Sequence, residues 1–271
     1  MGVPSYATAP DGRDWTKLPD DVTASILVLS NLGAFDILTE YQMVCKTWRR
    51  VFCNYPILWR TIDYADLQDS PFPCMKYRDY FRNEKCMEKM CRNAIDRSCG
   101  KLVDITLEGD YGTDDLLKYM TDSCSGIRRL TLDCCDITDE GLREVASKLP
   151  LLEDLVISDA SLSHPSKTVE AIGQSCPLLK SFRWEKDLEI NTKGLDDDYA
   201  KAISGTMHGL HHLSLFGFYL TDDALKEIID CCPHLESLDL EYVCIKHFRI
   251  IRRGLEKKMR GRIKKLKLPS C

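Results

Sequence analysis

The sequence predicts an α/β fold: an N-terminal all-helical unit followed by a curved solenoid, with parallel strands on the concave face and helices on the convex face. Two observations predict it. An apolar triplet with a spacing of three and then two residues recurs seven times between residues 102 and 268. Residues 15–60 follow a different pattern. Their apolar residues recur at helical spacing, and they hold three of the four tryptophans. We therefore divide the chain into a flexible N-terminus (1–14), a helical unit (15–63), a connector with a capping helix (64–98) and a solenoid of about seven repeats (99–271).

The helical unit begins at Leu18-Pro19, where a proline near the first turn and two following acids favour a helix start. Gly33 can end this helix, and apolar residues predict a second helix over 35–45 and a third from Trp48 to Pro56. The unit has about twenty large apolar residues, more than a few short helices can bury. We expect a partner to cover one face; the alternative is that the unit packs only against the solenoid.

The connector divides into two parts. Residues 64–83 contain Pro71 and Pro73 and predict an irregular segment. Residues 84–98 carry Met87, Cys91 and Ile95 at helical spacing. We expect this helix to cover the open end of the first repeat, because a solenoid needs a cap at its end.

Each triplet of the solenoid predicts a short strand, because its last two members alternate with polar residues and so face one side. A helical pattern follows each strand, as in residues 141–149, and stacked copies bury both apolar faces continuously. Thr138 and Thr221 stand where a hydroxyl group would cap the next helix. The seven triplets are Leu102-Ile105-Leu107, Ile127-Leu130-Leu132, Leu152-Leu155-Ile157, Leu179-Phe182-Trp184, Leu210-Leu213-Leu215, Leu235-Leu238-Leu240 and Ile263-Leu266-Leu268.

The chain has fourteen cysteines, and we expect them to be free thiols that pack in the core. No pair has the C-x-x-C spacing of a zinc or redox site, and Cys99, Cys124, Cys176 and Cys232 each lie three residues before a triplet. We find no phosphate-binding loop, nucleophile elbow or HExxH motif, so we expect no catalytic residue, no metal and no cofactor.

The charge is unevenly spread. Residues 246–271 carry eleven Lys or Arg and one acid, which is +10, whereas the rest of the chain sums to −15. This basic end is either a nuclear import signal or the solvated face of a folded end repeat. With no signal peptide or membrane span in the sequence, we expect a nuclear or cytoplasmic protein that binds neither membrane nor nucleic acid.

Two sets of motifs resemble known families. Leu18-Pro19-x-Asp21, Ile26-Leu27, Leu32, Val44-Cys45-x-x-Trp48-Arg49 and Leu58-Trp59-Arg60 resemble an F-box. Leu130, Leu132, Cys135, Ile137, Thr138, Asp139, Gly141 and Leu142 resemble a cysteine-containing leucine-rich repeat. Together they resemble the plant F-box/leucine-rich-repeat proteins of the Skp-interacting-partner type, over nearly the whole chain from Trp15.

The resemblance implies a substrate-recognition subunit of a Skp–cullin–F-box E3 ubiquitin ligase, non-catalytic itself, that contacts cullin and a RING protein through the Skp adaptor. The implied adaptor contacts are Leu18, Pro19, Ile26, Leu27, Leu32, Val44, Cys45 and Trp48. The spacing between Ile26-Leu27 and Leu32 is two residues longer than is usual in the family. Either Val28-Leu29 takes the place of Ile26-Leu27 or the turn between the helices is longer.

The polar strand residues of the concave face are the candidate substrate contacts, and acids dominate them, so we expect a basic substrate segment. The candidates are Arg129, Asp133, Asp154, Arg183, Glu185, His212, Phe216, Asp239 and Glu241. Trp184 falls on an inward position, and we expect it to pack in the core. Two alternatives stay open: an interaction scaffold that does not recruit cullin, and a small-molecule-gated receptor.

Overall fold

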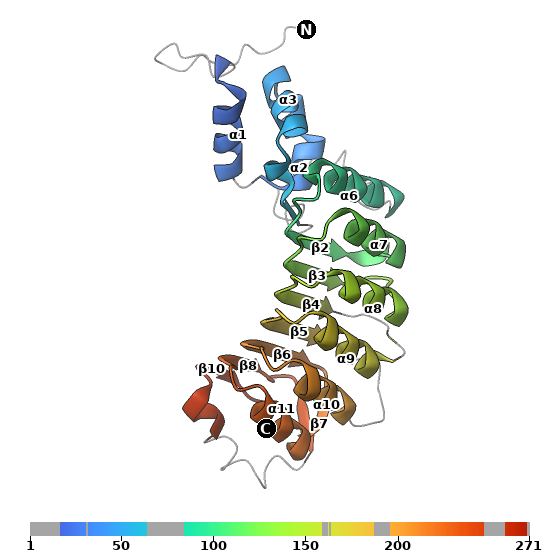
Figure 1. Cartoon of the computed structure of the whole chain (residues 1–271), viewed down its shortest axis with the longest axis vertical. Helices are drawn as coiled ribbons and strands as arrows, with labels where there is room; N and C mark the ends of the chain where they lie inside the picture. Colours follow the sequence, from blue (N-terminus) through green and yellow to red (C-terminus); the bar gives the residue numbers. More distant parts are fainter. Residues whose placement is uncertain are drawn as a thin grey trace.

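The computed structural model describes residues 17–30, 32–63, 84–158, 162, 164–186, 196–246 and 258–269. The expectations of a flexible N-terminus at 1–14 and an irregular connector at 64–83 fall outside these residues. The predicted fold class is confirmed: a small set of helices leads into a parallel sheet flanked by helices. Figure 1 shows the repeats stacked in an arc, with strands along the inner side and helices along the outer side.

The helical unit is built from five short elements. They are α1 (Asp20–Leu29), α2 (Ala34–Thr39), the 3-10 helix η2 (Tyr41–Met43), α3 (Lys46–Asn54) and the 3-10 helix η3 (Pro56–Trp59). The prediction of a single second helix over 35–45 is wrong. The backbone leaves helical geometry at Glu40 (φ −125°, ψ −57°), which divides this segment into α2 and η2. The core of the unit is aromatic and aliphatic, and the Trp59 indole N–H donates to the Phe52 carbonyl at 2.8 Å.

Among the described residues, the sheet has eight parallel strands in the order β1-β2-β3-β4-β5-β6-β8-β10. They are β1 (Thr61–Ile62), β2 (Asp104–Glu108), β3 (Arg129–Asp133), β4 (Asp154–Ser158), β5 (Ser181–Glu185), β6 (His212–Phe216), β8 (Ser237–Asp239) and β10 (Lys265–Lys267). Successive triplets pair in register, so that Leu107 lies beside Leu132, Leu132 beside Ile157, and Trp184 beside Leu215. The sequence did not predict β1, which extends the sheet to the helical unit.

Helices cover the outer face of the sheet. They are α6 (Glu84–Ser98), α7 (Asp114–Ser123), α8 (Asp139–Lys148), α9 (Pro165–Ser175), α10 (Asp197–Thr206) and α11 (Asp222–Cys231). The first of them, α6, buries Met87, Cys91, Ala94 and Ile95. A short 3-10 helix, η4 (Gly109–Tyr111), follows β2, and β7 (Tyr219–Thr221) pairs with β9 (Cys244–Lys246) in a separate small sheet.

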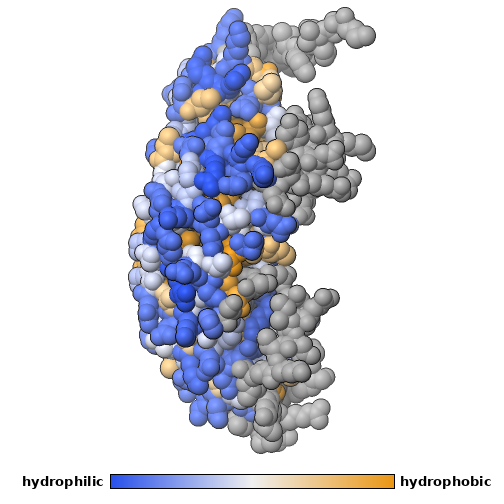
Figure 2. Space-filling view, turned by 90° about the vertical axis from the view of Figure 1, so that its right-hand side faces the viewer, coloured by the Kyte–Doolittle hydropathy of each residue, from blue (hydrophilic) through white to orange (hydrophobic). Residues whose placement is uncertain are grey.

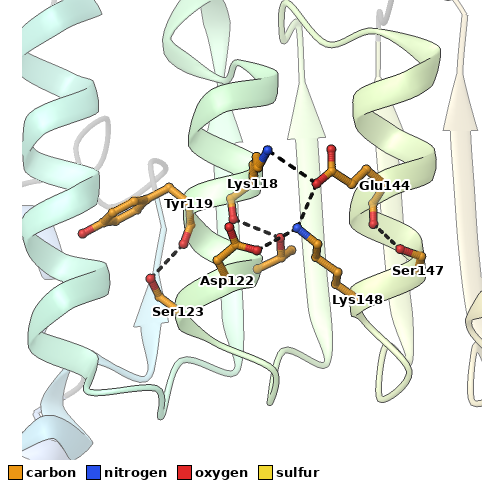
Figure 3. Close-up of polar contacts among 8 residues, drawn as sticks. Lys118, Tyr119, Asp122, Ser123, Glu144, Ser147 and Lys148 are labelled. Carbon is orange, nitrogen blue, oxygen red and sulfur yellow. Dashed lines mark hydrogen bonds and ion pairs between the residues drawn. The ribbon is translucent and has the colours of Figure 1, made fainter.

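The helix side of the solenoid is a hydrophilic surface (Figure 2). Between α7 and α8, the Lys148 ammonium lies 2.7 Å from Asp122 and 2.9 Å from Glu144, and Lys118 lies 3.9 Å from Glu144 (Figure 3). These side chains are largely exposed, so each pair contributes little to stability. These four charges between α7 and α8 are therefore paired with one another.

At two places in the solenoid, the aspartate that begins one helix bonds to the threonine that caps the next helix. Asp114 accepts hydrogen bonds from the N–H (3.0 Å) and the hydroxyl (2.6 Å) of Thr138. Asp197 accepts the same two bonds from Thr221 at 2.8 and 2.9 Å. Gly141 leaves room for this contact, because a Cβ at that position would lie 1.9 Å from Asp114 Oδ1. We call this arrangement the aspartate clasp.

The two predicted helix caps are confirmed. The Thr138 hydroxyl accepts from the Gly141 N–H at 3.1 Å, and the Thr221 hydroxyl accepts from the Ala224 N–H at 3.2 Å. Each threonine therefore caps its own helix while it donates to the aspartate of the preceding repeat.

The expectation that the cysteines pack in the core is wrong for Cys53, Cys99, Cys134 and Cys244, which are exposed. Cys124, Cys176 and Cys232 are buried, and burial raises the pKa of the Cys176 and Cys232 thiols to about 11. The expectation for Cys99 is wrong: it is exposed with φ 47°, and Ser98 is buried in its place. Helix α6 leads directly into the first repeat, and its last residue, Ser98, takes the buried position that a cysteine occupies in three later repeats.

Candidate functional site: two protein-interaction surfaces

The first candidate surface is an exposed apolar stripe on helix α1. Val22, Ile26 and Leu29 are 41, 42 and 85% exposed and recur at i, i+4 and i+7, so they share one side of the helix. Thr23 and Leu27 lie on the opposite side and are buried. We call Val22, Ile26 and Leu29 the docking stripe.

A second exposed apolar pair lies where η2 meets α3. Met43 is 72% exposed and Val44 is 61% exposed. Cys45, the next residue, caps α3 by accepting the Trp48 N–H on its sulfur at 3.4 Å. The cap holds the backbone extended just after Val44, which keeps the pair at the surface.

The predicted adaptor residues separate by exposure. Pro19, Ile26 and Val44 are exposed, and Leu18, Leu32, Cys45 and Trp48 are half-buried. Leu27 is only 2% exposed, so its side chain supports the core of the unit and offers no surface to a partner. Val22 and Met43 were missed as adaptor contacts, and Leu29 was named only in the alternative to Ile26-Leu27. Helical spacing from Ile26 is the signal that identifies Val22 and Leu29.

The extra residues after Ile26-Leu27 belong to helix α1. Val28 and Leu29 form its last positions and are both exposed, and the Ser30 hydroxyl donates to the Ile26 carbonyl at 2.9 Å. The extra residues therefore extend α1 to Leu29, which continues the docking stripe of Val22 and Ile26.

An ion pair fixes α1 against α3. The Arg50 guanidinium donates to both carboxylate oxygens of Asp20, at 2.5 and 2.7 Å. This bond holds the pKa of the Asp20 carboxyl below its usual range. The orientation of the docking stripe is thereby tied to the third helix of the unit.

A hollow of about 230 Å³ lies between the helical unit and the first strands. Leu27 and Leu32 line it together with Arg129, so the structure brings two predicted adaptor residues close to a predicted substrate residue. Its other walls are Val28, Ile37, Ile57, Leu58, Arg60, Thr61 and Val103.

The second candidate surface is the inner face of the sheet. The fifth positions of the long strands lie in register and point away from the core, as a row of five half-buried side chains. We call this the rim row; it consists of Glu108, Asp133, Ser158, Glu185 and Phe216. Its last member, Phe216, contacts Tyr242 with a ring-centroid distance of 4.6 Å.

Several predicted substrate residues are already paired within the chain. Arg129 lies 2.7 Å from Asp104, and Lys267 lies 2.9 Å from Asp239 and 3.5 Å from Glu241. The charges of Asp239 and Glu241 are therefore partly neutralised by Lys267 of β10, which belongs to the basic end of the chain. Arg183 lies 3.9 Å from Glu185, which is a looser contact.

The remaining predicted residues differ in their surroundings. His212 is exposed at the start of β6. Asp154 is half-buried, and within the described part of the chain its Oδ1 is buried with no hydrogen-bond partner. Trp184 is 2% exposed and stacks edge-on against Phe182 and Tyr199, so the expectation that it packs in the core is confirmed.

The acids at one end of the rim row lie close together. Glu108 has its pKa raised, first by burial and then by the charges of Asp133 and Asp63. No salt bridge to Glu108 or Asp133 is present among the described residues. A cation at this end of the row would meet two carboxylates on neighbouring strands.

Neither a metal site nor a membrane-spanning helix is present among the described residues. They contain no group of three or more His, Cys, Asp or Glu side chains that could hold a metal ion. His211 and His234 stack with centroids 5.9 Å apart. Among the same residues, no helix has the length and apolar character needed to cross a membrane.

Comparison with known proteins decides the family. The F-box protein SKIP19 of Arabidopsis thaliana is 41% identical over 238 residues, covering 88% of this chain and 72% of the relative. The F-box/LRR-repeat protein 9 of the same plant is 38% identical and covers 84% and 87%. The chain belongs to the F-box/leucine-rich-repeat protein family. Within it, the chain is of the plant Skp-interacting-partner type that its motifs resemble.

Three further findings complete the comparison. This F-box/leucine-rich-repeat protein is 42% identical to the F-box/LRR-repeat protein 23 of Arabidopsis thaliana, but it spans only 56% of that relative's length. No protein-family profile matches the chain. Among solved structures, the tropomodulin C-terminal domain of Caenorhabditis elegans aligns with a TM-score of 0.41 and 14% identity, over 54% of this chain and 92% of that one.

Proposed function

We propose that the chain is a substrate-recognition subunit of a Skp–cullin–F-box ubiquitin ligase and has no catalytic activity of its own. The helical unit binds the Skp adaptor, which brings cullin and the RING protein, and the inner face of the repeats binds a substrate protein. The observation that carries this proposal is the docking stripe, an exposed apolar surface on the F-box itself.

The exposed apolar side chains favour a protein partner at the F-box. Leu29, Met43 and Val44 are 85, 72 and 61% exposed. Fully burying one large aliphatic side chain contributes about 1.5–3 kcal/mol, so covering these three provides a substantial driving force. The half-buried Leu18, Leu32, Cys45 and Trp48 and the exposed Pro19 and Ile26 complete the proposed adaptor contact.

The substrate end of the proposal uses the candidate residues of the inner face. Arg183, Glu185, His212 and Phe216 are accessible there, and Asp133 has no salt bridge within the described part of the chain. Arg129, Asp239 and Glu241 are paired within the chain and Asp154 is half-buried, so we expect these four to contribute less to substrate binding. We expect the protein to act in the nucleus, the cytoplasm or both.

The described part of the basic end, residues 258–269, packs against the preceding repeat. Met259 and Ile263 are buried, and Lys264 lies 3.0 Å from Glu236 of the preceding repeat. These contacts favour a folded end repeat with a solvated charged face over a free import signal.

The small-molecule alternative finds little support in the hollow beside the F-box. Its volume of about 230 Å³ lies below the range of roughly 300–1,000 Å³ that drug-sized ligands occupy. The scaffold alternative differs from the main proposal only in cullin recruitment, so it is decided by experiment.

The deciding experiment is affinity purification of the chain from plant cells, with the Skp adaptor and cullin detected in the eluate. Leu29→Glu should abolish both, because a charge would then lie in the middle of the apolar contact. Leu178→Glu is the matched control, since Leu178 is also exposed (44%) but lies among the repeats. Adaptor without cullin in the wild-type eluate supports the scaffold alternative, and absence of both refutes the ligase proposal.

A further inference from the structure

The rim row runs across the strands, so its side chains are spaced by the distance between strands. Neighbouring strands lie about 4.8 Å apart. Asp133 on β3 and Phe216 on β6 are separated by three such steps, because β4 and β5 lie between them in the sheet. The two side chains are therefore about 14 Å apart along the row.

The two ends of the row differ in chemistry. Glu108 and Asp133 at one end are adjacent carboxylates without a salt bridge in the described part of the chain. Glu185 lies one strand from Phe216, and its contact with Arg183 is loose at 3.9 Å. The row as a whole is therefore acidic and complementary to a basic segment.

The far end of the row is an aromatic surface. Phe216 is half-buried and Tyr242 is 59% exposed, and their rings are in contact. The Gly217 N–H donates to the Tyr242 carbonyl at 3.1 Å, which holds the two loops together. Aromatic side chains placed in this way bind apolar groups strongly and with little loss of side-chain freedom.

We propose that the rim row and Tyr242 bind an extended basic segment of the substrate protein, in which a lysine or arginine lies about four residues from a large apolar residue. An extended chain rises about 3.3 Å per residue, so about four residues span the 14 Å between Asp133 and Phe216. The basic side chain meets Glu108 and Asp133, and the apolar side chain lies against Phe216 and Tyr242. The inference rests on the proposed function, because it names the class of substrate segment.

The test measures fluorescence anisotropy of labelled twelve-residue peptides on the purified full chain. The probe is a Gly/Ser peptide with one arginine and one leucine four residues apart. The first control peptide has the same composition but places the arginine and the leucine next to each other. The second control peptide has glutamate in place of arginine. We expect the probe to bind at least about tenfold more tightly than either control, and more weakly as salt rises.

Two variants test the residues. Asp133→Lys and Phe216→Ala should each weaken probe binding about tenfold or more. Glu140→Lys is the matched control, because Glu140 is exposed on α8, on the opposite side of the sheet, and should leave binding unchanged. Thermal unfolding of each variant shows whether it is folded. If Phe216→Ala does not fold, probe binding by Asp133→Lys alone tests the inference.

The inference is wrong if the adjacent-residue peptide binds as well as the probe, or if Asp133→Lys and Glu140→Lys bind it equally. Adaptor co-purification is measured on the same variants and is expected to be unchanged. Loss of peptide selectivity with intact adaptor binding refutes this inference alone, whereas loss of adaptor binding by the wild type refutes the proposed function.

Discussion

Replacing Lys186 with methionine should lower the local stability of the structure around α10. The Lys186 ammonium lies 2.5 Å from Asp196 Oδ1, and the two side chains are only 14 and 8% exposed. It also lies 4.5 Å from the ring centroids of both Tyr199 and Phe218. Methionine has a similar length but no charge, so the carboxylate of Asp196 loses its counter-ion in a mostly buried site.

The expected magnitude follows from this burial. Breaking a buried ion pair by removing one partner costs about 3–5 kcal/mol, and the residual exposure of Lys186 places the effect near the lower value, about 3 kcal/mol. Adding Asp196→Asn to Lys186→Met should recover much of the loss, because an asparagine oxygen can still accept the Tyr219 N–H, which lies 2.9 Å from Asp196 Oδ2.

The assay is amide hydrogen exchange, because a repeat protein opens locally and a single unfolding midpoint does not isolate one repeat. A loss of about 3 kcal/mol corresponds to exchange about a hundredfold faster in β6, β7 and α10. Lys201→Met on α10 is the matched control: Lys201 pairs with Asp198 at 3.1 Å, but the two are 64 and 78% exposed. Equal exchange in Lys186→Met and Lys201→Met, or no recovery in the double variant, would refute the reasoning.

Three further predictions concern the F-box core, the aspartate clasp and the rim row. Leu27→Ala should destabilise the helical unit by about 2–5 kcal/mol, whereas Leu29→Ala should change its stability little and weaken adaptor binding; urea unfolding and co-purification separate the two. Asp197→Asn should accelerate exchange in α11 about tenfold or more, because the two Thr221 donors bond to different carboxylate oxygens and asparagine replaces one of these oxygens with an NH2 donor. Glu108 has a pKa above its ordinary value of 4.5, so its ionisation opposes folding: its contribution to stability falls as the pH rises from 4.5 through the raised pKa. The difference in unfolding free energy between wild type and Glu108→Gln, measured across that range, should therefore shift in favour of the variant as the pH rises; a flat difference contradicts the prediction.

The strands of the solenoid could be predicted because their signal is local and repeated. Each triplet alternates with polar residues, and the pairing of Leu107 with Leu132 and Ile157 follows from stacking equal repeats. The helix caps at Thr138 and Thr221 were predictable for the same reason. The aspartate clasp was not, because it joins residues 24 apart whose meeting depends on how far each repeat rotates against the next.

The F-box surface was predicted less well, because motif resemblance does not say which side of a helix a residue occupies. Ile26 and Leu27 are adjacent in the motif, yet one is 42% exposed and the other 2%. A helical rotation of 100° per residue separates them, and the orientation of α1 is set by its contacts with α3 and η3. Cys99 was misplaced for a similar reason, since the end of α6 interrupts the repeat before its first strand.

Strand β1 connects the two proposed surfaces in one hydrogen-bonded sheet. Thr61 and Ile62 pair with Asp104 and Ile105, and the Arg60 carbonyl accepts from the Val103 and Asp104 N–H groups at 2.9 and 3.1 Å. Helix α6 contacts η3 and α2 on one side and α7 on the other. The docking stripe and the rim row are therefore held by a shared sheet and a shared helix (Figure 1). In the proposed ligase this fixes the position of the bound substrate segment relative to the adaptor, which a flexible tether between the two units would not do.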